Sequence, residues 1–189
     1  MKHLPLLLTL VPFLAFSKTR LNDYYVGFEI ATVDHDIIDG ELFDLSANMP
    51  LEGSNLIFNL TFGDASGDVN GTKIGIKFDI GADYLHHFDN FDGFVPFVGV
   101  GLNYADFDVN DDIFWNLYAG LEFSVSDQLS LLPRLRLYQG FGDYDDTELE
   151  ASISLTYWIN DMHGLSLGYT HNAAGEADYI GLQYLYSWE

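Results

Sequence analysis

Clusters of acidic residues are the first feature of the sequence that could carry chemistry. One short segment places oxygen ligands at alternate positions, as calcium-binding loops do: Asp106, Asp108, Asn110 and Asp112. The segment lacks the glycine at the sixth position and the distant bidentate glutamate of such a loop. A second cluster comprises Asp143, Asp145 and Asp146. The pattern predicts solvated, self-repelling surface loops, and it leaves open a weak association with divalent cations.

The histidines give little sign of a metal site. His86 and His87 are adjacent on a predicted strand, so their side chains face opposite sides and cannot easily share a metal ion. His35 and His163 fall in predicted loops, and no histidine has a partner at metal-ligand spacing. The chain has no cysteine, which excludes a thiolate metal site, a disulfide scaffold and a cysteine nucleophile. We therefore predict no metal-binding residues.

A glycine pair could suggest a nucleotide cofactor. Gly99 and Gly101 begin a dinucleotide-like spacing, but Tyr104 stands where the third glycine is needed. No helical period follows the pair, and the phosphate-binding fingerprint requires a helix there. We therefore predict no cofactor-binding residues.

His171 is the best candidate for catalysis. It lies near the end of a predicted strand, and Asn172, Gly175 and Glu176 follow it. A hydrolase that used this histidine as a base would need a hydroxyl nucleophile nearby. Ala173 occupies the position two residues further on, and it has no hydroxyl. We therefore predict no catalytic residues.

The composition narrows the class of protein. The 189 residues include 29 acidic and 7 basic side chains, for a net charge of −22, and 48% of the residues are hydrophobic. Such a chain can bury a large apolar area, and its length fits one domain. The acidity argues against nucleic acid as a partner, because neutralising phosphates requires lysine and arginine.

The first residues have the features of a secretory signal peptide. Lys2 and His3 precede an apolar run over 4–16, and Ala15 and Ser17 have the small-x-small spacing that a signal peptidase recognises. The run is about 13 residues long, whereas a helix needs ~20 to span a bilayer, which argues against a membrane anchor. We predict a signal peptide over 1–17 and one exported domain over 18–189.

The mature chain repeatedly alternates apolar and polar residues. Val26, Phe28 and Ile30 fall on one face of a predicted strand, and Gly27 and Glu29 fall on the other. Longer acidic segments and shorter turns alternate between successive strands, as they would at the two ends of an antiparallel meander. We predict an all-β, up-and-down barrel of about ten strands, over 26–30, 43–49, 56–62, 74–84, 98–104, 115–123, 131–137, 149–159, 165–169 and 180–188.

Alternation alone does not say which face points inward. A soluble barrel hides its apolar face, whereas an outer-membrane barrel turns that face toward lipid. Three features favour the membrane arrangement. The polar face contains many small residues, namely Gly27, Gly75, Gly81, Gly99, Gly101, Gly120, Gly168 and Gly181. It also carries both signs of charge, in Glu29, Lys77, Asp79, Asp83, Glu122, Arg134, Arg136 and Glu150.

The third feature is aromatic. Tyrosine and tryptophan prefer the headgroup level of a membrane, where one end of the ring is in water. Such residues recur near the predicted strand ends, at Tyr24, Tyr25, Tyr84, Tyr104, Trp115, Tyr157, Tyr169, Tyr186 and Trp188. We therefore predict that the apolar face contacts lipid.

Two segments carry a family resemblance. Residues 94–104, FVPFVGVGLNY, are similar to the PYVGxGxGY strand of the small bacterial outer-membrane β-barrels, the opacity-protein and A-type outer-membrane barrel group. The last strand resembles the signal that the barrel-assembly machinery reads, through Gly181, Tyr184 and Tyr186. That group commonly ends in an aromatic residue, whereas here Trp188 is penultimate. The resemblance implies a transmembrane barrel in the outer membrane of a Gram-negative-type bacterium, with eight strands possible beside ten.

The resemblance also frames the function. It implies the lipid bilayer and lipopolysaccharide as partners, and divalent cations could screen the repulsion between acidic loops and that anionic lipid. Lipid A deacylases are barrels with a His-x-Ser-Asn-Ala-Gly stretch near the position of His171, and this chain lacks their serine. We predict a structural or surface-interaction role without catalysis. The alternatives are a small cation-preferring pore, a soluble periplasmic barrel that binds an apolar ligand, and a lipid-acting barrel hydrolase.

Overall fold

The computed structural model describes residues 21, 23–34, 39–63, 66–69, 72–88, 91, 93–107, 110–142, 146–173 and 177–188. The predicted signal peptide lies outside the described residues, as do His35, Asp108, Asp143, Asp145, Gly175 and Glu176. Across the described ranges, no helix has the length and apolarity needed to cross a membrane.

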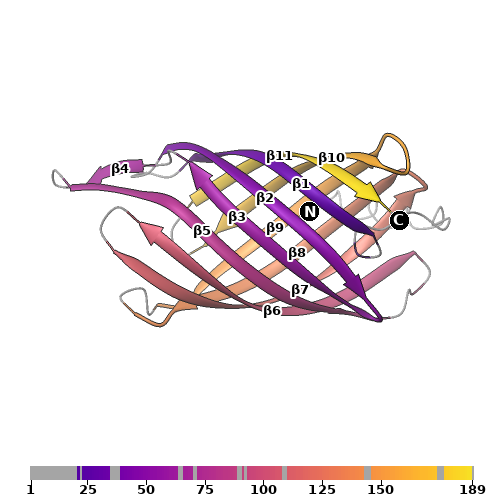
Figure 1. The fold of residues 1–189 in the computed structure, drawn as a ribbon, viewed down its shortest axis with the longest axis horizontal. Coiled ribbons are helices and arrows are strands. Elements are labelled where there is room, and N and C mark those ends of the chain that lie inside the picture. The colour runs from indigo at the N-terminus through magenta and orange to yellow at the C-terminus, as the bar shows by residue number, and fades with distance from the viewer. Residues whose placement is uncertain are drawn as a thin grey trace, which may run out of the picture.

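The described chain forms one closed antiparallel sheet (Figure 1). Strands that are consecutive in the ring pair with each other, and β1 pairs along its length with both β2 and β11, which closes the barrel. The strands are β1 Tyr24–Asp34, β2 Asp39–Leu51, β3 Ser54–Gly63, β4 Ser66–Val69, β5 Thr72–His87, β6 Phe94–Phe107, β7 Asp111–Ser126, β8 Leu129–Gly140, β9 Glu148–Trp158, β10 His163–Asn172 and β11 Ala177–Trp188.

Ten of these strands form the ring, and β4 is an addition to it. β4 pairs with the beginning of β5, and it extends the β3–β5 hairpin past one end of the barrel (Figure 1). The prediction of ten alternating strands is therefore confirmed, and the eight-stranded alternative is wrong. The sequence reasoning did not predict β4, because its four residues lie in a segment read as an acidic turn.

The strand connections divide the barrel into two ends. The connections β1–β2, β3–β5, β6–β7, β8–β9 and β10–β11 share one end, which we call the loop end. The connections β2–β3, β5–β6, β7–β8 and β9–β10, which are shorter on average, share the other end with the start of β1 and the end of β11, and we call it the turn end. Outer-membrane barrels place short turns on the periplasmic side and longer loops outside.

The two faces of the wall differ as the alternation predicts. Apolar side chains cover the outside, and several are more than half exposed, including Leu102, Leu135 and Leu182. The inward-facing positions hold buried polar residues such as Asn55, Asn116 and Gln183. Apolar surface in water is unfavourable by ~25 cal/mol for each Å², so a continuous exposed apolar face of this kind requires lipid. The predicted orientation, apolar outward and polar inward, is confirmed.

Tyr25 departs from its predicted place in an outer aromatic band. It is only 7% exposed and packs inside the barrel against Trp158 and Leu185. Neighbouring strand residues point to opposite faces, so Tyr24 takes the outer position and is 40% exposed. Other members of the predicted band do lie outside, namely Tyr84, Tyr157, Tyr169, Tyr186 and Trp188.

Candidate functional site: the lumen of the barrel

The interior of the barrel holds a cavity of about 650 Å³. Its lining comes from inward-facing side chains of strands all around the ring, and it reaches from Leu21 and Tyr25 near the turn end to Phe107 and Asn172 near the loop end. Pockets that bind small molecules typically measure ~300–1,000 Å³. The lumen is therefore large enough for a small solute, and its chemistry depends on which side chains line each part of it.

One side of the lumen is acidic. Asp44 on β2 and Asp79 and Asp83 on β5 line it, and we call these three residues the acidic wall. Among the described residues, no ion pair joins any of the three to a basic side chain. Their negative charge is therefore left to face the cavity.

Neutral donors hold the acidic wall in place. The hydroxyl of Thr61 donates to Asp44 at 3.0 Å. Asp79 accepts from Asn59 at 3.1 Å and from Asn103 at 2.8 Å. Asn116 donates to Asp83 at 3.1 Å and to the oxygen of Asn103 at 2.9 Å. These amides and hydroxyls fix the carboxylates in position without cancelling their charge.

Another part of the lining is basic, and its two cations come from one strand. Arg134 on β8 donates from Nε to the hydroxyl of Ser152 at 3.2 Å. Arg136 forms an ion pair with Glu150 at 3.1 Å, and its guanidinium lies 5.1 Å from the ring centroid of Tyr138. The positive charge of Arg136 also attracts Asp79 and Asp83 of the acidic wall. The lining therefore carries the acidic wall on β2 and β5 and both of these arginines on β8.

A hydrogen-bonded cluster lines the lumen near the loop end. The hydroxyl of Tyr138 donates to Glu148 at 2.5 Å, and the amide of Asn172 donates to the same carboxylate oxygen at 2.6 Å. Asn172 also donates to the Tyr138 oxygen at 2.6 Å. Because every member has a partner, the cluster orders this part of the lining.

Glycines create the space that these polar groups occupy. A Cβ at Gly101 would overlap the carboxylate of Asp83, and a Cβ at Gly181 would overlap that of Glu29. Gly168 differs, because the nearest atom to its added Cβ would be 4.0 Å away. The prediction that small residues make room in a narrow interior is therefore confirmed at Gly101 and Gly181, while Gly168 borders open space.

Apolar side chains pack together at the turn end of the lumen, beside buried polar residues such as Asn48, Asn55 and Glu122. Buried residues from β5, β6 and β7 pack there against a residue that precedes β1, and we call this cluster the apolar floor: Leu21, Leu85, Val95, Phe97 and Tyr118. Tyr25, Trp158 and Leu185 form a second buried cluster at the same end. The cavity therefore meets an apolar boundary at the turn end and a charged lining toward the loop end.

The predicted catalytic candidate lies outside the lumen. The Nδ1 atom of His171 is 2.8 Å from Asp178 across the β10–β11 pair, and the hydroxyl of Tyr169 donates to the same oxygen at 2.7 Å. This carboxylate can orient the imidazole as it would orient a general base. All three side chains lie on the exposed outer face near the loop end, and Ala173 offers no nucleophile.

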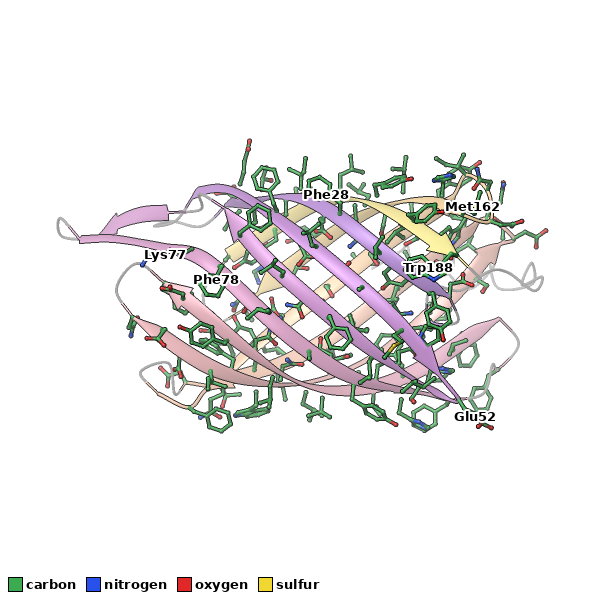
Figure 2. The ribbon with its side chains drawn as sticks, in the orientation of Figure 1. Phe28, Glu52, Lys77, Phe78, Met162 and Trp188 are labelled. Carbon is green, nitrogen blue, oxygen red and sulfur yellow. The ribbon has the colours of Figure 1, made fainter. Side chains whose placement is uncertain are left out.

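The acidic loop residues that the structure describes take part in local contacts. Asp106 pairs with Lys77 at 3.4 Å, which places this lysine at the rim. Asp112 accepts from the backbone N–H groups of Ile113 and Gly142. Within the described ranges, no group of three or more histidine or acidic residues could hold a metal ion. Figure 2 shows Lys77 at the opposite end of the barrel from Glu52, Met162 and Trp188.

The remaining histidines also lie apart from the acidic wall. His86 contacts the edge of the Phe88 ring near the turn end, with centroids 5.0 Å apart. His163 lies 2.6 Å from the hydroxyl of Tyr184 on the outer face. His86 is exposed and His87 is half-buried, as expected for neighbours that face opposite sides of a strand.

Comparison with solved structures finds the same architecture in outer-membrane channels and porins. The chain is similar to an outer-membrane channel from Pseudomonas putida F1, with a TM-score of 0.61 at 8% identity, covering 92% of this chain and 98% of that one. It is similar to the NanC porin, with a TM-score of 0.58 at 8% identity and coverage of 87% and 99%. It is also similar to the KdgM porin in complex with disordered oligogalacturonate, with a TM-score of 0.55 at 9% identity and coverage of 87% and 99%.

No protein-family model and no curated protein sequence matches the chain. The resemblance to solved structures establishes the fold, which is that of outer-membrane β-barrel proteins.

Proposed function

We propose that the protein is an outer-membrane barrel whose lumen passes small polar solutes and favours cations. The observation that carries the proposal is the cavity lined on one side by the acidic wall of Asp44, Asp79 and Asp83. Rings and clusters of acidic side chains attract cations in narrow pores, and a pore with a low-dielectric wall concentrates that effect.

The balance of charge in the lining supports the preference for cations. Six acidic residues line the cavity, namely Glu29, Asp44, Asp79, Asp83, Glu148 and Glu150. Among the described residues of the lining, Arg134 and Arg136 are the basic side chains that oppose them. Arg136 is already paired with Glu150, so an anion entering the lumen would meet more repulsion than attraction.

The test is ion selectivity in planar bilayers. The purified protein should show a small conductance and a reversal potential on the cation side in a salt gradient. Asp79→Asn with Asp83→Asn should move that potential toward zero, because two of the six carboxylates that line the cavity lose their negative charge. Asp127→Asn, in the exposed β7–β8 turn, removes a charge outside the lumen and should leave the potential nearly unchanged. Anion selectivity of the unaltered protein would contradict the proposal.

A second candidate function is a membrane-embedded scaffold that presents acidic loops and does not conduct. The apolar filling of the turn end favours it, because a blocked lumen leaves the outer surface and loops to act. In that case no conductance would appear in the wild type or in variants that open the turn end. Catalysis has the weakest support, since the His171–Asp178 pair has no adjacent nucleophile at Ala173.

Several features of export and assembly belong to the same proposal. We propose that residues 1–17 are removed on export and that the closing strand β11 presents Gly181, Tyr184 and Tyr186 to the barrel-assembly machinery. The full-length pairing of β11 with β1 supports a closing role for that strand. Detergent-dependent extraction from the outer membrane, with a gel band that shifts on boiling, would test the placement. We also propose that divalent cations screen the repulsion between the acidic loops and anionic lipopolysaccharide.

A further inference from the structure

We infer that Leu21, which precedes β1, seals the turn end of the lumen. The inference rests on the proposed passage of solutes, because a seal has a consequence only if the lumen conducts. It concerns the apolar floor and not the acidic wall, and it predicts how far passage is limited and not which ions are preferred.

Leu21 occupies the interior although it belongs to no wall strand. It lies three residues before the first residue of β1, Tyr24, and is only 5% exposed. Its side chain packs with Leu85 and Phe97 in the apolar floor, and it borders the cavity. The chain therefore enters the barrel at the turn end before it joins the wall.

Two buried polar residues hold the backbone of Leu21. Its N–H donates to Oε2 of Glu122 at 3.3 Å, and its carbonyl accepts from the amide of Asn55 at 2.6 Å. Both Glu122 and Asn55 are 0% exposed. Asn48 continues the contact by donating to the carbonyl of Asp23 at 2.7 Å.

The burial of Glu122 and Asn55 explains why their hydrogen bonds form a docking site for Leu21. A buried carboxylate or amide is unfavourable unless it is hydrogen-bonded, so the bonds to Leu21 add to the stabilisation of Glu122 and of Asn55, which also donates to Asn48 at 3.0 Å. They bond to the backbone N–H and carbonyl of Leu21, which fixes the depth at which this residue lies in the lumen. With that depth fixed, the Leu21 side chain is held against the apolar floor.

The apolar character of the contact determines how the seal works. A hydrophobic constriction blocks ions by excluding water, and it opens when a polar group lets water enter. Leu21 is the member of the apolar floor that is not anchored in a strand of the wall. Movement or substitution of this one residue should therefore open the lumen while the barrel stays intact.

The experiment compares single-channel conductance of the full-length protein with that of Leu21→Ser. Leu51→Ser is the matched control, because Leu51 lies at the same end but is 46% exposed on the outside. We expect a several-fold rise in open-channel conductance for Leu21→Ser and no change for Leu51→Ser. The reversal potential of Leu21→Ser should stay on the cation side, because the acidic wall is untouched.

A second variant removes the docking contact and keeps the leucine. Asn55→Ala deletes the donor to the Leu21 carbonyl and should raise the frequency of openings, and a gel band that shifts on boiling verifies that each variant is folded. If the wild type conducts and both variants match it, the seal is refuted while the proposed passage stands. If neither wild type nor variants conduct, the proposed passage itself fails.

Discussion

The two halves of the lumen are built on the same strands but have opposite chemistry. On β8, Leu132 packs against the apolar floor near the turn end, while Arg134 and Arg136 reach into the charged part of the cavity. On β5, Leu85 belongs to the floor, while Asp79 and Asp83 form most of the acidic wall. On these two strands the inward-facing row therefore changes from apolar at the turn end to charged in the cavity.

This difference separates stability from selectivity. Close packing of apolar side chains contributes free energy through burial and dispersion, so the turn-end half should carry much of the interior's contribution to stability. Charges beside a cavity contribute little net stability but set which solutes enter. We therefore expect substitutions in the two halves to affect different measurements.

The largest expected effect is on stability in the turn-end half. Trp158 is 2% exposed and fills space beside Tyr25 and Leu185. Trp158→Ala should lower the free energy of unfolding by about 3–5 kcal/mol, as measured by urea unfolding of the protein in lipid vesicles. Ser154→Ala, which faces the cavity from the same strand, should change it by less than about 0.5 kcal/mol. Equal losses of unfolding free energy in the two variants would contradict the expectation that the turn-end half carries more of the stability.

A smaller effect should appear where a glycine makes room for a charge. Gly101→Ala places a methyl group against Asp83, so it should lower conductance and cost about 1–3 kcal/mol of stability. Gly168→Ala is the matched control, because its methyl group would meet open space. That variant should retain wild-type conductance and unfolding. A Gly101→Ala protein that behaves like Gly168→Ala would show that the acidic wall has more freedom than its hydrogen bonds suggest.

The sequence predicts the wall of the barrel better than its contents. The alternation of apolar and polar residues predicts where the strands lie and which face each side chain occupies, because successive side chains of a strand point to opposite faces. The same alternation predicts that the lumen holds both signs of charge, because Asp79 and Arg134 stand at positions predicted to face inward. Ordering the strands around the ring would in addition have separated the acidic wall on β2 and β5 from the arginines on β8.

Other features could not be read from alternation. Leu21 is one leucine between polar neighbours, and its burial depends on Glu122 and Asn55, which are distant in the sequence. Tyr25 was assigned to the outer face because aromatic residues favour membrane interfaces, but the strand register places it inside. His171 and Asp178 come together only through the pairing of β10 with β11. Contacts between distant segments determine all three.

The most direct test of a wet loop-end half and a sealed turn-end half is cysteine labelling along β9. The chain has no cysteine, so single substitutions report one position each. Ser152 lines the cavity, Thr156 is 1% exposed toward the turn end, and Ile153 lies on the outer face. A hydrophilic maleimide added from the loop side should label Ser152→Cys rapidly, and it should leave Thr156→Cys and Ile153→Cys unlabelled. Equal labelling at Ser152→Cys and Thr156→Cys, or labelling only at Ile153→Cys, would contradict the account.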